Sequence, residues 1–199
     1  NPTQNINLRL SYSSGFRAPQ AFDEDMHIEN VGGTVAMIER AKDLKEEKSQ
    51  SFSVSADMYH RFGAFQTNLL IEGFYTRLTD VFVLGKPYDR GDGILVKTRS
   101  NGPGAKVMGL TLEGKVAYLS ILQIQAGLTL QRSRYDEPHK WHDDAPAEKK
   151  IFRTPDTYGY FTATCTPIKP LSIALSGTYT GRMLVQRMDI TAENGELGK

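Results

Sequence analysis

Residues 105–118 read AKVMGLTLEGKVAY, and residues 121–134 read ILQIQAGLTLQRSR. Apolar residues alternate with polar or small ones in both stretches, and the clearest of them are Met108, Leu110, Leu112, Leu122, Ile124 and Leu128. A period of two predicts antiparallel β-strands that separate an apolar environment from a wet one. Because only Leu119 and Ser120 join the stretches, we expect them to be neighbours in one sheet.

Five further segments alternate in the same way, at residues 4–14, 49–61, 64–77, 156–166 and 171–181. The connections between the segments are long at 15–48, 78–104 and 135–155 and short at 62–63, 119–120 and 166–170. A sheet with every long connection at one end is typical of an outer-membrane β-barrel, whose periplasmic end needs only turns. Segments of this length exceed the roughly 5–6 residues usual in soluble sheets and suit a tilted span of about 9–11 residues.

The two faces of the predicted strands differ sharply in polarity. One face carries Leu110, Leu112, Leu122, Ile124, Leu128 and Leu175, and the other carries Asp57, Glu72, Glu113, Gln123 and Gln125. A water-filled or plugged lumen would hydrate the second set, which a packed core would not accept. The sequence therefore predicts an all-β fold, an antiparallel meander of about seven strands from a transmembrane barrel. The alternative from another class is a soluble, carbohydrate-binding β-sandwich, which would bury the leucines in a core.

Composition excludes several other classes of protein. A net charge of +1 over 199 residues argues against general nucleic-acid binding, and the single cysteine, Cys165, excludes an internal disulfide. No segment approaches the ~18 apolar residues of a membrane-spanning helix. No Ser/His/Asp, Cys/His or paired-carboxylate arrangement points to an enzyme, so we expect none and no cofactor. Residues 36–48 have helical composition, and a short loop helix is expected there.

Several motifs occur in a collinear order that makes a family nameable. They are SSGFRAP (13–19), LKEEKS (44–49), GFYTRLTD (73–80), Asn101-Gly102 with GLTLE (109–113), RTP (153–155) and GTYTGR (177–182). The first resembles the signature that ends one barrel strand in TonB-dependent outer-membrane receptors. The second resembles that family's Leu-x-Pro-Glu-x-Ser lead-in to the next strand, with Glu46 where proline is usual.

This resemblance implies a roughly 22-stranded barrel with an amino-terminal plug, in the outer membrane of a Gram-negative bacterium. Residues 1–199 would be a partial barrel domain, with the signal peptide, the plug and the last strands outside it. The implied function is import of a scarce nutrient, a ferric siderophore first and haem or a cobalamin next, energised by the TonB complex through the plug. The other expected partner is outer-membrane lipid, and the excised sheet is expected to self-associate through its edges.

Because side chains alternate between the two faces of a strand, the residues of the first two motifs can be assigned to the lumen side or the outer side of the sheet. Gly15, Arg17 and Glu47 fall on the lumen side, and Phe16 falls outside at the height of an aromatic girdle. A bidentate ion pair between Arg17 and Glu47 would close the base of the first long loop. Pro19 lies near the start of that loop. The alternative is that both are ordinary solvated charges.

Three loop clusters are candidates for ligand chemistry. His139, His142 and Asp143 suit zinc, copper or nickel, unless this is a polar loop in which Trp141 contacts a partner or substrate. His27, beside Asp25, matches the interval at which some haem-taking relatives place a histidine. The alternative for that acidic run is a solvated loop. Tyr88 opens an Asp-Gly turn in the second long loop and is a further ligand-loop candidate.

Overall fold

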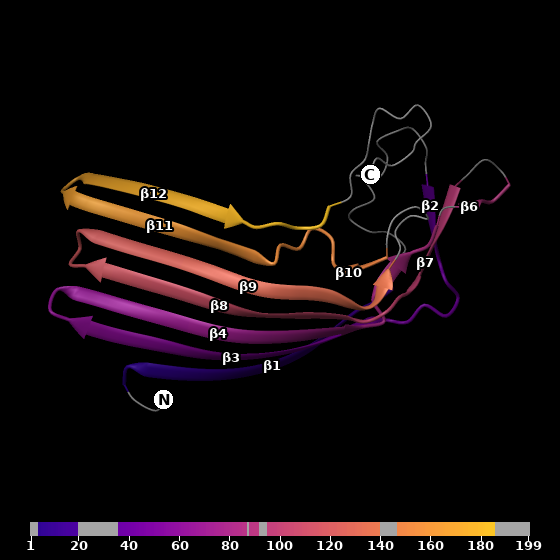
Figure 1. Ribbon diagram of the computed structural model, residues 1–199, viewed down its shortest axis with the longest axis horizontal. Helices are drawn as coiled ribbons and strands as arrows, with labels where there is room; N and C mark the ends of the chain where they lie inside the picture. The colour runs from indigo at the N-terminus through magenta and orange to yellow at the C-terminus, as the bar shows by residue number, and fades with distance from the viewer. Residues whose placement is uncertain (1–3, 20–35, 87, 92–94, 140–146, 186–199) are drawn as a thin grey trace.

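The computed structural model describes residues 4–19, 36–86, 88–91, 95–139 and 147–185 (Figure 1). Long strands cross one sheet in chain order: β1 (Ile6–Arg17), β3 (Glu47–Phe62), β4 (Phe65–Thr79), β8 (Ala105–Tyr118), β9 (Leu122–His139), β11 (Thr157–Ile168) and β12 (Leu171–Thr180). Each is antiparallel to the next, and a short strand, β10 (Glu148–Lys150), also pairs with β9. The tight turns lie at one end of the sheet and the long connections at the other, which confirms the predicted meander and loop asymmetry.

Some strands run further than their sequence pattern indicated. β1 continues through Gly15 and Phe16 to Arg17, and β9 continues to His139. The pairing of β1 with β3 extends without a break to the pair Arg17 and Glu47, so the backbone hydrogen bonds continue where the apolar alternation has ended. The first long connection is therefore shorter than residues 15–48.

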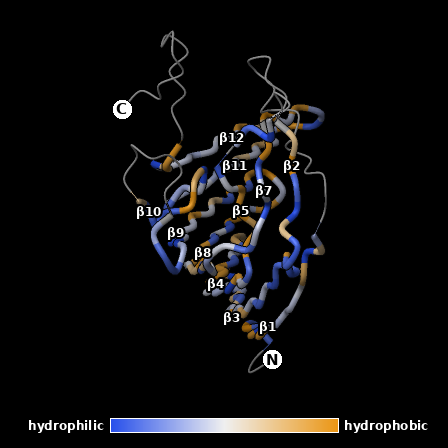
Figure 2. Tube along the Cα trace, turned by 90° about the vertical axis from the view of Figure 1, so that its right-hand side faces the viewer, coloured by the Kyte–Doolittle hydropathy of each residue, from blue (hydrophilic) through white to orange (hydrophobic). Residues whose placement is uncertain are grey.

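The long strands form one curved layer, with β1 and β12 at its edges (Figure 2). Among the described residues only Val96 and Ala105 are buried hydrophobic side chains, whereas Leu10 is 81% exposed and Leu175 is 63% exposed. A sandwich would have buried such residues against a second sheet. A single layer with one apolar face excludes that alternative and suits a wall that faces lipid.

Register pairs show that the predicted faces are correct. Leu112 lies opposite Leu128, whereas Lys115 lies opposite Gln125 on the other face. On that polar face the amide nitrogen of Gln125 donates to Glu113 Oε1 at 2.7 Å and to the Tyr160 hydroxyl at 2.8 Å. The polar side chains thus satisfy one another across strands, as a wet inner wall allows.

Glycine lets an aromatic ring lie flat on the neighbouring strand at two points of this inner face. A Cβ at Gly127 would lie 2.5 Å from a ring carbon of Tyr160, and one at Gly109 would lie 2.5 Å from a ring carbon of Phe74. Glycines in strand interiors often mark such close approaches. Cross-strand aromatic rings over glycine also help to fix strand register.

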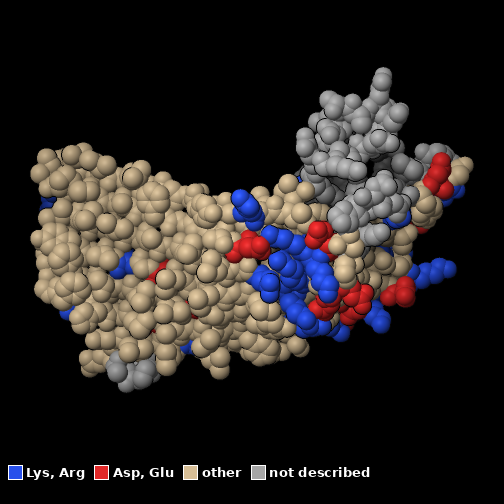
Figure 3. Space-filling model, in the orientation of Figure 1, with Lys and Arg blue, Asp and Glu red and all other residues tan. Residues whose placement is uncertain are grey.

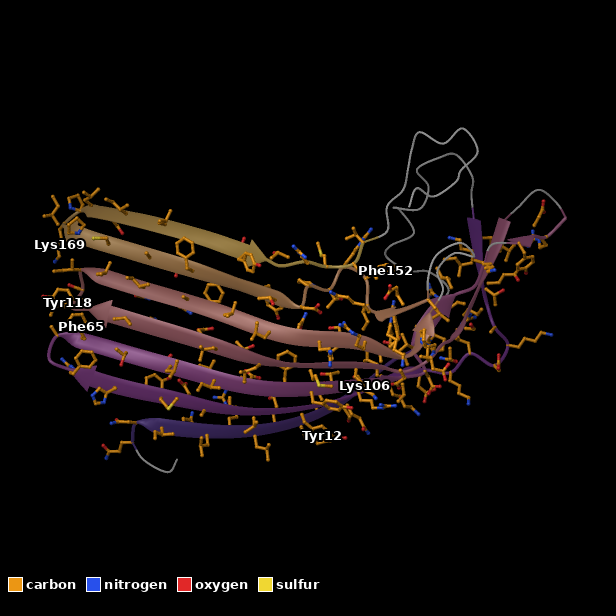
Figure 4. The ribbon with its side chains drawn as sticks, in the orientation of Figure 1. Tyr12, Phe65, Lys106, Tyr118, Phe152 and Lys169 are labelled. Atoms are coloured by element: carbon orange, nitrogen blue, oxygen red, sulfur yellow. The ribbon has the colours of Figure 1, made fainter. Side chains whose placement is uncertain are left out.

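Aromatic residues border the apolar outer face at both ends. At the turn end the ring of Phe65 lies 4.8 Å from that of Tyr118, and at the loop end the ring of Tyr12 lies 4.7 Å from that of Phe52, the register partner of Tyr75 (Figure 4). The ten positions from Phe65 to Tyr75 span about 33 Å along the strand. At a strand tilt of about 40° the band is about 25 Å tall, the height of the apolar band of outer-membrane barrels.

A second, four-stranded sheet joins the first two long loops. It comprises β2 (Ala36–Arg40), β5 (Phe82–Leu84), β6 (Tyr88–Asp89) and β7 (Leu95–Asn101). β2 runs parallel to β7, and β5 and β6 are antiparallel to it. The described residues include no helix long and apolar enough to cross a membrane.

The expectation of a helix at residues 36–48 is wrong. Residues 36–40 form β2, and the backbone N–H of Ala41 still donates to the carbonyl of Arg99 on β7 at 2.9 Å. Helical spacing of apolar residues lasts only briefly there, and so short a helix gains little on its own. Pairing with a strand from another loop supplies the backbone hydrogen bonds instead.

Candidate functional site at the base of the outer loops

The ends of β1 and β3 meet the second long loop at Phe82. Arg17 and Glu47 are register partners, so their side chains leave the same face of the sheet. Glu47 Oε2 accepts a hydrogen bond from the backbone N–H of Phe82 at 3.0 Å, and the guanidinium carbon of Arg17 lies 5.6 Å from the centre of the Phe82 ring. Both signature residues therefore hold the first residue of β5, and cation–π attraction adds to the hydrogen bond.

Asn101 holds the other side of the same junction. Its amide nitrogen donates to the carbonyls of Lys45 at 3.0 Å and Asp80 at 2.8 Å, and its amide oxygen accepts from the backbone N–H of Lys45 at 2.8 Å. Asp80 has a φ of 55°, a left-handed conformation that aspartate tolerates better than most residues. One side chain thus satisfies backbone groups of both long loops. We call Arg17, Glu47, Phe82 and Asn101 the loop clasp.

The remaining signature residues lie around the clasp. Gly15 faces Ser49 across the strand pair, and the Ser49 hydroxyl lies 3.4 Å from its carbonyl oxygen. Phe16 is 76% exposed on the outer face, and Pro19 is half-buried just beyond β1. These positions agree with the sides assigned by parity. The roles of these residues in function stay predictions.

One predicted ligand-loop residue, Tyr88, lies in the small sheet. Its hydroxyl donates to Glu39 Oε2 on β2 at 3.4 Å, and Arg90 Nη1 lies 3.7 Å from the other oxygen of that carboxylate. Tyr88 is also half exposed. It therefore links the first two long loops and keeps an accessible ring edge.

The other candidates are not brought together in the described part of the chain. Asp25, His27, Trp141, His142 and Asp143 lie outside the described residues, and of His139 only the backbone is placed, as the last residue of β9. Among the described residues no group of three histidine, cysteine or carboxylate side chains could hold a metal ion. The proposed metal and haem ligands therefore stay predictions.

Sequence analysis missed two features of this end of the sheet. Asn101 was noticed as part of a motif, but its three hydrogen bonds join positions far apart in the sequence. The second feature is an ion-pair network in which Asp136 Oδ2 lies 2.8 Å from Arg77 Nη2 and its other oxygen 3.0 Å from Lys106 Nζ. The ion-pair network follows from the register of β4 and β8, and the Asn101 contacts depend on how the first two loops meet above the sheet.

Comparison with known proteins supports this reading of the fold. A family model described as "TonB dependent receptor-like, beta-barrel" matches residues 1–188. Two solved variants of the FrpB iron transporter from Neisseria meningitidis are similar in fold. The F3-3 variant has a TM-score of 0.59 at 16% identity over 90% of this chain, and the F5-1 variant has 0.50 at 18% over 83%. No curated protein sequence matches.

The chain spans about a quarter of the length of these two transporters, 25% of one and 26% of the other. The family model, by contrast, covers nearly all of this chain. Its proteins lie in the outer membrane of Gram-negative bacteria, in agreement with the apolar band and the one-sided loops. The chain belongs to the TonB-dependent receptor-like β-barrel family.

Proposed function

We propose that this chain forms part of the wall and the outer mouth of a receptor that imports a ferric siderophore, energised by the TonB complex. The observation that carries the proposal is the arrangement of the sheet: an apolar outer face, a polar inner face, and the first two long loops held at one end by the loop clasp. Such a wall separates lipid from a hydrated passage. Loops anchored at its outer rim can present side chains to an arriving ligand.

Iron is the favoured cargo because both similar structures are of iron transporters. The loop clasp also supports tight binding, because it restricts the motion of the loops before a ligand arrives. It joins the first loop to the second through Glu47, Phe82 and Asn101, and the small sheet joins them again through β2 and β7. Loops joined in this way lose less entropy on binding than free loops would, which favours tight capture of a dilute ligand.

Uptake by the full receptor tests this proposal. The receptor gene is expressed in a bacterium that lacks its own iron receptors, and cells are supplied with radioactive iron on catecholate, hydroxamate or citrate chelators. We expect uptake with at least one chelate, and loss of that uptake when the TonB gene is deleted. Parallel assays supply haem and cobalamin.

The outcomes separate the parts of the proposal. Uptake of haem or cobalamin without any chelate would overturn the siderophore but keep the transporter. Uptake that persists at the same rate without TonB would overturn energised import. The variant Asn101→Ala should lower the affinity for the imported chelate while the barrel stays folded, because it loosens the loops and leaves the wall intact.

A further inference from the structure

The first two long loops share one sheet, and the strand from the first loop depends on it entirely. We call β2, β5, β6 and β7 the loop sheet. Every residue of β2, from Ala36 to Arg40, pairs with a residue of β7, and the backbone N–H of Ala41 adds a hydrogen bond to the carbonyl of Arg99. Among the described strands, β2 has no partner from its own loop. Lifting the first loop away from the second would therefore break a whole row of backbone hydrogen bonds.

Side chains fasten the same two loops across β7. Tyr88 on β6 and Met37 on β2 are both register partners of Val96, which lies between them in the sheet and is fully buried. Glu39 on β2 accepts a hydrogen bond from the Tyr88 hydroxyl at 3.4 Å, and its other carboxylate oxygen lies 3.7 Å from Arg90 Nη1. The loops are thus joined by side chains as well as by backbone.

The loop sheet has a packed centre of its own. The largest fully buried side chains among the described residues are those of Arg99, Val96 and Ser133, and the first two belong to β7. Val96 and Arg99 are three positions apart, so they point to opposite faces of that strand. β7 is therefore covered on both faces and paired on both edges. Closely packed groups of this kind do not deform gradually, so they move together.

Few residues tie the loop sheet to the wall. The connections are residues 41–46 between β2 and β3, 80–81 between β4 and β5, and 102–104 between β7 and β8. All three meet at Asn101, whose amide group bonds Lys45 in the first connection and Asp80 in the second, and which directly precedes the third. The other contacts of the loop clasp lie at the same junction. The loop sheet is therefore joined to the wall along one line.

The position of the loop sheet makes its motion relevant to the lumen. Figure 2 shows β2, β5 and β7 on the concave side of the curved wall, which faces the lumen in a closed barrel. Figure 3 shows charged side chains gathered at this end of the molecule, beyond a nearly uncharged surface. The loop sheet thus lies in water at the mouth of the lumen. A body that turned about its line of attachment there would widen or narrow the mouth.

We propose that the first two long loops open and close over the lumen as one body, with Asn101 at the hinge. Separating the loops would break the ladder between β2 and β7 and expose Val96, whereas turning both together bends only three short connections. The inference rests on the proposed import function, because a mouth that admits a chelate must open. It goes further in excluding independent motion of the two loops.

A disulfide between the two loops tests this inference in the full receptor. Ile38→Cys/Lys97→Cys places cysteines at register partners of β2 and β7, which lie within reach of a disulfide. Cys165→Ser in every variant keeps the natural thiol from pairing with them. Uptake of the imported chelate should be equal with the pair oxidised and reduced, because the bond joins parts that already move together. Uptake that falls on oxidation and recovers on reduction would overturn the proposal.

Two further cysteine pairs complete this experiment, and heat-modifiable migration on a gel checks the folding of each variant. Lys45→Cys/Asn101→Cys spans the hinge, where the Lys45 N–H donates to Asn101 Oδ1 at 2.8 Å. Its oxidised form should lose uptake relative to its own reduced form, which equally lacks the Asn101 side chain. Ser51→Cys/Thr76→Cys, whose native hydroxyl oxygens lie 2.8 Å apart within the wall, is the matched control and should show equal uptake in both states. Unchanged uptake by the oxidised hinge pair, or an equal loss in the control, would contradict the hinge.

Distances between spin labels separate this inference from the proposed function, because they need no transport. Arg40 on β2, Lys86 beyond β5 and Leu119 at the turn end are exposed sites for labels. One body predicts a narrow distribution for the distance from Arg40 to Lys86 and broad ones from each of them to Leu119. An equally broad distribution between the two loops, or three equally narrow ones, would overturn the proposal. A receptor with coupled loops that imports no nutrient would overturn the import function alone.

Discussion

On a single strand, residues a few positions apart face opposite surroundings. Leu128 on β9 lies opposite Leu112 on the outer face, near the middle of the apolar band. Gln125 lies on the inner face with Glu113 and Tyr160. The free energy of introducing a charged side chain should therefore depend mainly on whether the position faces outward or inward, and less on how far along the strand it lies.

Replacing Leu128 with arginine should lower the free energy of unfolding of the full receptor by about 2–4 kcal/mol, the range for a cation at the bilayer midplane. Gln125→Arg should change it far less, because the new guanidinium would lie in the wet lumen beside Glu113. Denaturant titration of the receptor in lipid vesicles measures both. Equal losses for the two variants would contradict the assignment of the faces.

Arg17 and Glu47 share Phe82 as a partner, so they should act together in ordering the first two loops. We expect a coupling energy of no more than about 1 kcal/mol, because Arg17 is exposed and Glu47 and Phe82 are only partly buried. It should appear in ligand affinity more than in barrel stability. A double-mutant cycle with Arg17→Ala and Glu47→Ala in the full receptor measures it, and strictly additive effects on ligand binding would show that the two residues do not cooperate.

Two aspartates at the loop end of the sheet, Asp136 and Asp156, contact basic side chains and should titrate below free aspartate. Contact with the Lys106 ammonium, reinforced by Arg77, lowers the pKa of Asp136, and contact with Lys150 lowers the pKa of Asp156. A lowered pKa means that the carboxylate stabilises the folded sheet above pH ~4 and that this stabilisation is lost as the pH falls through the folded-state value.

Carboxyl-carbon NMR of the selectively labelled receptor can follow these two aspartates through an acid titration. Both midpoints should lie below that of an aspartate in an unfolded peptide. Lys106→Gln should move the midpoint of Asp136 upward and leave that of Asp156 nearly unchanged, because Asp156 pairs with Lys150 and Arg134 instead. An unchanged midpoint for Asp136 would show that Lys106 is not its main partner.

Among the elements, the long strands could be predicted from the sequence and the loop sheet could not. Period-two alternation is a local signal, so β8 was found with its correct bounds and the start of β9 to within one residue, although β9 runs on to His139. The pairing of β2 with β7 joins residues in two different loops, and nothing in residues 36–40 alone indicates it. The helix expected there was wrong for this reason: tertiary pairing outweighed a short local preference.

The same contrast applies within the candidate site. Parity placed Arg17 and Glu47 on one face because both continue strands whose alternation was clear. It could not identify Phe82 as the residue they hold, nor Asn101 as the link from Lys45 to Asp80. These contacts depend on how two loops meet above the sheet.

Asn101→Ala should open the base of both loops without unfolding the wall. Three hydrogen bonds are lost, each with a net value of about 0.5–1.5 kcal/mol, so the local opening free energy should fall by about 1.5–4.5 kcal/mol. Hydrogen exchange should quicken at residues 44–47 and 80–85 and stay unchanged in β8 and β9. Asn101→Asp keeps an acceptor for Lys45 N–H, so its effect should be smaller, and faster exchange throughout the sheet would contradict a local role.

For the molecule as a whole, the sheet is an open wall whose two edge strands are β1 and β12. The barrel implied by the family would pair both edges with further strands. Within the described sheet, the outward hydrogen-bonding groups of β1 and β12 are the places where another chain can add. The unpaired edges therefore determine whether a polypeptide of residues 1–199 associates with other copies of itself.

An isolated polypeptide of residues 1–199 in detergent should therefore self-associate through β1 and β12, and sedimentation velocity should show oligomers that grow with concentration. Lysines at Ser11 and Ser176, on the polar faces of the two edge strands, should reduce this association, because inward-pointing charges oppose edge-to-edge pairing. The same substitutions should leave the assembly state of the full receptor unchanged, since its edges are paired within the barrel. A fragment that stays monomeric at every concentration, or a full receptor that associates as strongly as the fragment, would show that these edges are not what drives association.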